Sequence, residues 1–554
     1  MLDFKDDKSN RILNDFYADE VEDRARIRAQ QLGLRYADLR GVPFHNDGLA
    51  MLSEEKARAW QAVPFDREGQ TVHLASVDPE RTEVKQYVKS LLDDGLVVNQ
   101  FVISEASLEK AWPLYAEIAA VKRTNLGDLG IQSGALVDLV KTQKTAAEII
   151  PLLEGGLQPG QKTTQLVELL VATAVSTDAS DIHLEPQEDY TQLRFRLDGV
   201  LQPLLEYSAD MHKRLLSRIK LMSGLKLNVN AEAQDGRFSI KIADREIEVR
   251  TSIMPGAFGE SVVMRLLNPD SARVNITALG MRPEMLEVVK GEINKPNGLI
   301  LTTGPTGSGK STAIYSLLKE IYQPGIKIIT IENPVEYHLE GIVQTQVNKD
   351  KGYDFYDGLK SALRQDPDVI MVGEIRDANT AKTGVQAALT GHLVFSTLHT
   401  NDPAGAIPRL FDLDILPDTL GPAVNLILAQ RLVRLVHEKY RQEVPLTDLD
   451  RNNLEKLFEG LDEKYWRKHL DRGTKFIADP SVADEVAYHG RTGVFEAIVV
   501  DKKLEDIIRE NTGLNSIRAA QVSQGLPTLP QDTALKALEG KTTFEEASRV
   551  VSLF

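Results

Sequence analysis

The sequence predicts an α/β protein of several domains, with a helix-covered parallel sheet in its second half. The chain has 554 residues, more than one hydrophobic core usually organises, since a domain holds about 150 residues. Near-continuous apolar strands recur after Gly298 with helical segments between them, as expected when both faces of a parallel sheet are buried. Strands of alternating polarity precede them, which predicts a separate α+β domain.

Composition excludes several classes of protein. Apolar residues make up 42% and charged residues 26%, which is typical of folded globular chains. The chain has no cysteine, which excludes disulfides, thiolate nucleophiles and zinc sites built from Cys ligands. We expect no secretory signal in residues 1–16, and the apolar stretches are too short to span a membrane. The net charge of −16 opposes non-specific nucleic-acid binding, so no nucleic-acid partner is expected.

The first part of the chain is predicted to be a module followed by a linker. Residues 1–125 are expected to form a small α/β module, with helical spacing in 29–39 and 54–61 and a strand over 70–77. Turn-forming residues concentrate in 126–162, at Gly127, Gly134 and the cluster 154–162, which predicts a linker.

Two further domains are expected after the linker. Residues 163–280 should form the α+β domain, with a helix over 163–175 and strands over 192–204, 237–242, 245–254 and 260–267. Residues 281–554 should form the parallel-sheet domain, with strands over 299–303, 327–331, 369–372 and 393–397. From about Pro417 we expect mostly helix, with the charged stretch 438–475 as solvated surface.

The strongest motif is a phosphate-binding loop at 304–312. Its residues are Gly304, Pro305, Thr306, Gly307, Ser308, Gly309, Lys310, Ser311 and Thr312, and it follows a predicted strand and opens a helix, as a P-loop must. The glycines let backbone N–H groups approach phosphate oxygens, and the helix N-terminus adds a favourable dipole. We expect Lys310 to bind the β and γ phosphates of ATP and the Ser311 hydroxyl to coordinate Mg²⁺. The alternative is a glycine-rich turn that binds nothing.

Hydrolysis also needs an acidic side chain at the end of a neighbouring strand, to hold the metal or position water. Glu374 ends one apolar strand, with Gly373 where many P-loop proteins have an aspartate. Glu332 ends another strand, and Glu336 follows Pro334. Each could instead be a carboxylate in solvent. We predict that Glu374, Glu332 and Glu336 take part in catalysis and that Glu374 also binds the metal.

Histidines and arginines supply two weaker signals. His392 and His399 flank an apolar strand; a lone histidine is usually structural, but His399 could sense the γ-phosphate and couple its loss to movement. Period two places Arg194, Arg196 and Asp198 on one face of a strand. That face could simply be hydrated, or the guanidiniums could meet nucleotide phosphate across a subunit contact.

In combination these motifs resemble the secretion ATPases that drive type II secretion and type IV pilus assembly. The similarity covers about 163 to 500 and is very specific. The motifs occur in the family's order: ASDIHLEP (179–186), LRFRLDG (193–199), RTSIMPGAFGESVVMRLL (250–267), GPTGSGKST (304–312), TIENPVEY (330–337), LRQDPDVIMVGEIRD (363–377), TGHLVFSTLHTNDPAGAIPRL (390–410), AQRLVRLV (429–436) and GRTGVFE (490–496).

The resemblance implies a RecA-like P-loop ATPase domain over 281–554, preceded by a PAS-like domain over 163–280. It makes 304–312 the Walker A loop, 330–337 the aspartate box, 366–377 an atypical Walker B segment, in which a glycine at 373 is normal, and 391–400 the histidine box. It also implies that Arg194, Arg196, Arg250 and Arg265 are directed toward nucleotide.

The resemblance implies partners and cofactors as well. These are ATP and Mg²⁺, a cytoplasmic homohexamer, and an inner-membrane platform protein on which the ring docks to move pilin or pseudopilin subunits. Residues 31–78 are similar to the N-terminal module of assembly and secretion members, which retraction motors lack, so assembly is favoured over retraction. The arginine-led repeat that would support cyclic di-GMP binding is not found in that module.

Two departures from the family pattern stand out. The aspartate box usually reads Glu-Asp-Pro, and here Asn333 replaces the aspartate, which puts a metal-positioning role there in doubt. Many members carry a four-cysteine zinc finger, whereas the matching positions here are His437, Tyr440, Pro480 and Ala483, so no zinc is expected. The insertion at about 437–485 is then a metal-free lobe, or packs in another way.

Two other functions remain open on the sequence. Hexameric P-loop engines often handle DNA or serve conjugation, although the acidity of this chain argues against it. A nucleotide-binding scaffold that has lost hydrolysis is conceivable because of Asn333. The product, whether a pilus, a secretion pseudopilus or a conjugative thin pilus, is not determined by these motifs.

Overall fold

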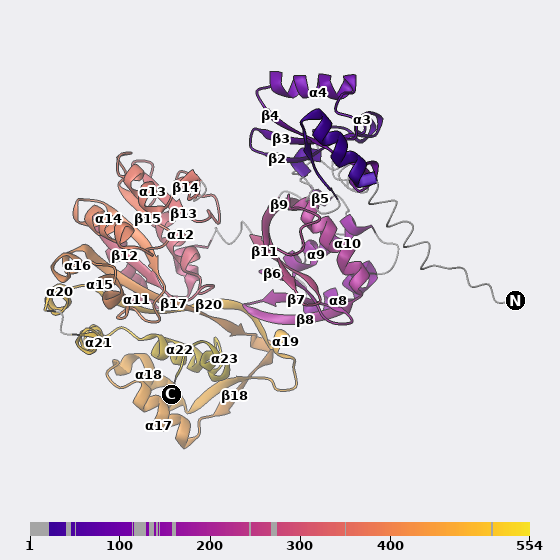
Figure 1. Ribbon diagram of the computed structural model, residues 1–554. Coiled ribbons are helices and arrows are strands. Elements are labelled where there is room, and N and C mark those ends of the chain that lie inside the picture. The colour runs from indigo at the N-terminus through magenta and orange to yellow at the C-terminus, as the bar shows by residue number, and fades with distance from the viewer. Residues whose placement is uncertain are drawn as a thin grey trace. The chain divides into compact units, whose positions relative to one another are not determined.

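The structure is a computed structural model that describes residues 21–39, 46–49, 51–112, 115, 129–131, 138–139, 142, 145–157, 162–242, 245–267, 274–348, 351–510 and 513–553. It divides into two compact units, Met1–Leu267 and Asn268–Phe554 (Figure 1). The expectations for residues 1–16, Gly127 and Gly134 lie outside the described residues.

The first unit begins with a small α/β module. A four-stranded sheet has the order β1-β4-β3-β2, with β1 (Arg35–Tyr36), β2 (Ala62–Glu68), β3 (Thr71–Ser76) and β4 (Val97–Val102). Its helices are α2 (Asn46–Leu49), α3 (Glu54–Trp60), α4 (Thr82–Asp93) and α5 (Glu105–Glu109). The predicted strand over 70–77 and helix over 54–61 are present as β3 and α3. The helix expected over 29–39 lies earlier, since residues 21–32 are helical and the chain is extended at β1.

A second sheet of the first unit has seven strands in the order β5-β9-β10-β11-β6-β7-β8. The elements are β5 (Leu129–Ile131), α8 (Ala146–Gly156), α9 (Thr163–Ser176), β6 (Asp181–Pro186), β7 (Thr191–Leu197), β8 (Val200–Tyr207), α10 (Ala209–Met222), β9 (Gln234–Ile242), β10 (Arg245–Gly256) and β11 (Gly259–Leu267). Apolar side chains of α9 and α10 join those of the strands in one core. The other face of the sheet therefore carries the polar residues of each strand.

Two features of this sheet differ from the sequence expectation. The segment expected to be a linker contributes β5, which pairs with β9, and the helix α8, whose apolar residues enter the core. The single strand expected over 192–204 is the hairpin β7–β8. Asp198 and Gly199 form its turn with φ of 49° and 85°, the left-handed pair that a tight hairpin requires.

The second unit is built on another seven-stranded sheet, in the order β14-β13-β15-β16-β12-β17-β20. Its strands are β12 (Gly298–Thr303), β13 (Ile328–Glu332), β14 (Val343–Gln346), β15 (Val369–Val372), β16 (Leu393–Leu398), β17 (Val424–Val436) and β20 (Tyr488–Val499), parallel except for β20. One core contains residues of α11 (Pro283–Ile293) and α12 (Lys310–Ile321), and another those of α14 (Ala378–Leu389), α15 (Ala406–Phe411) and α16 (Pro417–Ala423). Helices thus cover both faces, which explains the continuous apolar strands.

The expectation of mostly helix after Pro417 is wrong for the main sheet. The segment 424–436 is the long strand β17, which pairs with β12 and β20 and places apolar side chains in the cores on both faces of the sheet. Its continuous apolar character fits a buried strand as well as a buried helix, so periodicity could not separate the two.

The insertion after β17 forms a small lobe whose apolar residues share a core with later helices of the chain. It contains β18 (Arg441–Pro445), α17 (Asp448–Leu457), α18 (Glu463–Arg472), β19 (Thr474–Ala478) and α19 (Asp484–Ala487). After β20 follow α20 (Lys502–Arg509), α21 (Leu514–Val522), α22 (Leu529–Leu538) and α23 (Phe544–Val550). Apolar residues of α17 and α18, including the stacked Phe458 and Trp466, pack with those of α22. The charged stretch 438–475 is therefore not simply solvated surface.

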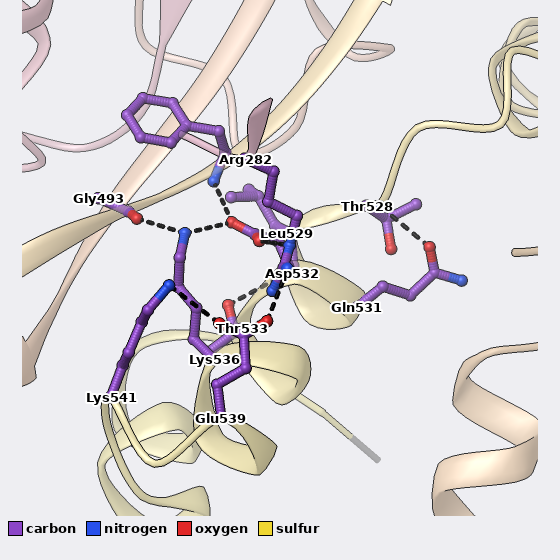
Figure 2. A network of polar contacts seen from close by, with 11 residues as sticks. Arg282, Gly493, Thr528, Leu529, Gln531, Asp532, Thr533, Lys536, Glu539 and Lys541 are labelled. Carbon is purple, nitrogen blue, oxygen red and sulfur yellow. Dashed lines mark hydrogen bonds and ion pairs between the residues drawn. The ribbon is translucent and has the colours of Figure 1, made fainter. Parts of the chain in front are cut away.

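A buried ion network fixes α22 to the sheet (Figure 2). The guanidinium of Arg282, just before α11, contacts Asp532 at 2.6 Å and Glu539 at 2.7 Å. The Lys536 ammonium contacts the same Asp532 carboxylate at 2.7 Å and donates to the carbonyl of Gly493 on β20 at 2.6 Å. The start of α11 and the helix α22 are thus joined to β20 through charges, of which Asp532 and Lys536 are almost fully buried.

Candidate active site

The P-loop connects the carboxyl end of β12 to α12, as the sequence predicted. Gly304, Gly307 and Gly309 all have positive φ, of 147°, 79° and 85°. At Gly304 a Cβ would lie 2.7 Å from the carbonyl oxygen of Gln430 and 2.6 Å from the Ser308 hydroxyl. A side chain is therefore excluded at Gly304 both by conformation and by space.

Lys310 begins α12 and folds back over the loop. Its Nζ donates to the carbonyls of Gly304 at 2.7 Å and Pro305 at 2.8 Å. Burial lowers the pKa of Lys310, and the nearby guanidinium of Arg431 lowers it further, whereas the carboxylates of Glu374 and Glu336 raise it. These two carboxylates are therefore close enough to act on the ammonium group at the loop.

The residues of the loop fit a magnesium-bound nucleotide. Glycines leave the inner side of the loop free of side chains, and the N-terminus of the twelve-residue helix α12 opens there. Within the described residues, the buried Ser308 Oγ and the Oγ1 atoms of Thr302 and Thr303 have no hydrogen-bond partner. Ser311, the second residue of α12, and Glu374 supply the oxygen donors that Mg²⁺ prefers.

Glu374 and His399 lie together at the ends of neighbouring strands. Glu374 follows β15 and His399 follows β16, and His399 Nε2 lies 3.3 Å from Glu374 Oε2. Arg376 also contacts Glu374, at 2.6 Å. Gly373 is tightly packed, since a Cβ there would lie 3.3 Å from both the carbonyl oxygen of Ile331 and the ring of Phe355. The structure thus brings together two of the predicted residues beside the P-loop.

Glu332 occupies a different environment, although it also ends a strand. Its side chain is buried and accepts hydrogen bonds from the hydroxyl of Tyr315 on α12, from Thr330 at 2.5 Å and from Gln344 at 3.1 Å. Beyond its burial, the neighbouring Glu332 carboxylate raises the pKa of Tyr315 above its ordinary range. Glu332 is therefore tied to the helix that follows the P-loop. No sequence motif singled out Tyr315, because its position on α12 is that of an ordinary buried aromatic residue.

The remaining predicted residues of this unit lie at its surface or at the opposite edge. Asn333 is exposed, and Glu336 is half-buried. His392 precedes β16 and contacts the carbonyl of Ala387, at the end of the strand opposite to His399. His392 is therefore separated from the P-loop by the length of β16.

The predicted arginines belong to the first unit, on the polar face of its second sheet. Cross-strand pairs form one row across five strands: Arg196, Asp181, Arg265, Arg250 and Arg237. The row holds four guanidiniums and one carboxylate, which contacts Arg265 at 2.9 Å and Arg196 at 3.2 Å.

Arg194 lies outside this row, on the same face, and contacts Glu185. Arg237 was missed by sequence reasoning. It alternates with the core residues of β9 and could have been found from that alternation.

The positions that match the zinc-finger cysteines of other family members, 437, 440, 480 and 483, all within the described chain, form no metal cluster. His437 and Tyr440 have ring centroids 5.3 Å apart. In the part of the chain that the structure describes, no three or more His, Asp or Glu side chains gather as metal ligands. Arg434 instead contacts Asp484 at 2.5 Å and Glu546 at 2.7 Å, which joins the end of the insertion to α23.

The fold and the loop together define a P-loop nucleotide-binding protein with a RecA-like sheet. Comparison with known proteins gives the particular family. A family model described as "Type II/IV secretion system protein" matches residues 158–549, and a model of the MshEN domain matches residues 32–112. The chain belongs to the type II/IV secretion system protein family and is an ATP-hydrolysing enzyme of that family. The predicted resemblance, fold class and enzyme class are confirmed.

Relatives with known names support this assignment. Type II secretion system protein E of Aeromonas hydrophila is 41% identical over 390 residues, 70% of this chain and 75% of that protein. The type IV pilus assembly ATPase PilB of Pseudomonas aeruginosa is 34% identical over 534 residues, 95% of this chain and 90% of that protein. The structure of the ATPase DotB of Legionella pneumophila aligns with a TM-score of 0.51 at 21% identity, covering 71% of this chain and 96% of that one, which supports the fold alone.

Proposed function

We propose that this chain hydrolyses MgATP in a cytoplasmic homohexamer and thereby powers assembly of a type IV pilus or of a type II secretion pseudopilus. The observation that carries the proposal is the grouping of Lys310, Glu374 and His399 at the carboxyl ends of β12, β15 and β16. The similarity to PilB extends over 95% of the chain and includes the N-terminal module. Type II secretion relatives have higher identity to this chain, so the secretion pseudopilus stays in the proposal as an alternative to the pilus.

Each site residue then has a chemical task. The P-loop amides and Lys310 bind the phosphates, and the Ser311 hydroxyl and Glu374 would hold Mg²⁺, which supplies charge neutralisation at the transferred phosphoryl group. Glu374 is positioned to orient the attacking water, and His399, within reach of the same carboxylate, reports whether the γ-phosphate is present. Glu332 acts through Tyr315 on the orientation of α12, and Glu336 adds negative charge near Lys310.

The arginine row supports a role at subunit contacts. Its guanidiniums lie on the polar face of the sheet, away from the core, and Arg265 is 59% exposed. Exposed arginines of this kind could contact the phosphates of a nucleotide bound to a neighbouring subunit, where an arginine finger raises the rate of hydrolysis by about 10³–10⁵. We propose that domain 163–280 carries this row and that domain 281–554 binds the nucleotide.

The module formed by residues 1–125 is proposed to dock the ring on an inner-membrane platform protein. In the described part of the chain no helix has the length and apolar character needed to cross a bilayer. The proposed membrane association therefore acts through a partner. Pilin or pseudopilin subunits are moved indirectly, and DNA is not part of the proposal.

Two substitutions test the proposed hydrolysis. Lys310→Ala removes the charge that binds phosphate and should abolish turnover, whereas Lys319→Ala near the end of the same helix should not. Glu374→Gln should keep ATP binding but stall a single turnover, with Glu340→Gln as the exposed control. Full hydrolysis in Lys310→Ala would refute the site. A wild-type ring that binds MgATP without cleaving it would favour the nucleotide-binding scaffold, and DNA-stimulated turnover would favour a DNA-handling enzyme.

A further inference from the structure

The motif AQRLVRLV (429–436) lies on β17, the strand that runs beside β12 and the P-loop. β17 pairs with β12 up to Thr303 and Ala429, and then continues past the point where β12 becomes the loop. Arg431 is thus the second residue beyond the end of that pairing. It is half-buried, and burial lowers the pKa of its guanidinium.

The guanidinium of Arg431 lies across the carboxyl end of β12. Its Nη1 donates to the carbonyl of Gln430 at 2.9 Å, and its Nη2 donates to the carbonyl of Asn401 at 2.8 Å. A Cβ built on Gly304 would lie 3.0 Å from Nη1, so the guanidinium packs directly against the first residue of the P-loop. One side chain of β17 therefore connects the segments that follow the carboxyl ends of β12 and β16.

The segment that Arg431 holds is the one that carries His399. After β16 the chain runs through His399, Thr400, Asn401 and Asp402. Thr400 donates to the carbonyl of Asp402 at 3.1 Å, and the Asp402 carboxylate accepts from the backbone of Gly405 at 2.7 Å and from Arg518 on α21 at 2.8 Å. Two arginines therefore hold this short segment, one at the P-loop and one at the helix α21.

A cavity adjoins these contacts. It has a volume of 640 Å³ and is lined by Asn401, Asp402, Arg431, Arg518 and Thr528, among others. Such a space lets the segment change conformation without displacing packed core, as a loop that responds to a bound ligand requires.

We propose that Arg431 is a positioning residue for ATP hydrolysis, which fixes the segment 399–402 against the P-loop so that His399 can respond to the γ-phosphate. This inference rests on the proposed function of the same site. This positioning requires an arginine, because the planar guanidinium donates to two carbonyl groups in different directions, whereas a lysine has a single ammonium group. Arg431 itself need not touch the nucleotide.

The test compares Arg431→Gln and Arg431→Lys with wild type in the full chain, with exposed Arg467→Gln as control. We expect kcat to fall about 10- to 100-fold in both Arg431 variants, since a misplacement of about 1 Å costs roughly this factor. The affinity for a fluorescent ADP should change by less than about 3-fold, because the residues of the phosphate-binding loop remain. The preference for a non-hydrolysable ATP analogue over ADP should be lost, and free guanidinium should restore turnover in Arg431→Ala but not in Lys310→Ala.

Two results would overturn the inference. Unchanged kcat and unchanged analogue preference would show that the contact to Asn401 is not needed. An equal loss of affinity for ATP and ADP, as in Lys310→Ala, would make Arg431 a phosphate ligand instead. Because nucleotide preference is measured without turnover, the inference can fail while the proposed hydrolysis stands, whereas a wild-type ring that does not cleave ATP would refute the proposed function on which the inference rests.

Discussion

Substitution of Asp532 by asparagine should lower the free energy of unfolding of the second unit by about 3–5 kcal/mol, the usual effect of removing one partner of a buried ion pair. The carboxylate is 2% exposed and contacts both Arg282 and Lys536 (Figure 2). It also accepts from the backbone N–H of Phe495 at 3.0 Å. An asparagine amide turns a donor toward one of these groups and has no charge for either cation.

Lys536 determines the size of the effect. After the substitution its partner among the described contacts is the neutral carbonyl of Gly493, whereas Arg282 still has Glu539. Burial already lowers the pKa of Lys536, so its ammonium is poorly solvated and needs a counter-ion. Adding Lys536→Met to Asp532→Asn removes that uncompensated charge and should recover part of the lost stability, since apolar replacement of a buried ion pair is often neutral.

The chain contains a suitable reporter. Trp466 stacks on Phe458 at 5.7 Å in the core shared with α22, and the other two tryptophans, Trp60 and Trp112, lie in the N-terminal module. With Trp60→Phe and Trp112→Phe as background, urea titration followed by Trp466 fluorescence reports this region. Asp471→Asn, an exposed change on α18, is the control. A loss below about 1 kcal/mol, or no recovery with Lys536→Met, would refute the network as a source of stability.

Three further predictions concern the sites of both units. Tyr315→Phe should lower the free energy of unfolding, measured by urea titration, by about 1.5–3 kcal/mol, the range of a hydrogen bond to a charged group. In steady-state kinetics it should lower kcat more than the affinity for ATP. Arg237→Gln should lower the ATPase rate of the assembled ring, measured as rate against protein concentration. Binding of a fluorescent ADP to the monomer should not change. Burial raises the pKa of Asp181, but hydrogen bonds from Ser180 and Arg265 hold that pKa below its ordinary value. Asp181 therefore stabilises the first unit above pH about 4, and this contribution is lost as pH falls through the folded-state pKa. Asp181→Asn should make the free energy of unfolding less dependent on pH in that acid range.

The P-loop could be predicted from sequence because its determinants are local. Glycines, a lysine and a helix start within nine residues fix the loop, and the strand before it needs only apolar character. Glu374 and His399 could be predicted for a related reason: the carboxyl ends of parallel strands meet at one edge of a sheet. The structure places both there.

Features that depend on distant residues could not be predicted. The donors to Glu332 come from positions 315 and 344, on different elements, and nothing in the local sequence pairs them. β17 could not be distinguished from a helix because its partner strand β20 follows only after the insertion 437–487. The insertion itself was interpreted by its charge, yet Leu454 and Phe458, and likewise Trp466 and Leu470, recur at the four-residue spacing that buries one side of a helix.

The environments of the carboxylates bear on the departure at Asn333. A missing carboxylate would matter most if position 333 supplied the negative charge at the P-loop. The carboxylates that act on Lys310 are those of Glu374, after β15, and of Glu336 within the same box, while Glu332 accepts a hydrogen bond from Tyr315 on α12. Since Asn333 is exposed and its neighbour Glu332 already has three side-chain donors, an amide at 333 leaves both the charge near Lys310 and the anchoring of α12 intact. The arrangement thus separates the carboxylate of Glu374, which follows β15 and is proposed to be catalytic, from that of Glu332, which ends β13 and is bound to α12, and the asparagine follows the second of these strands.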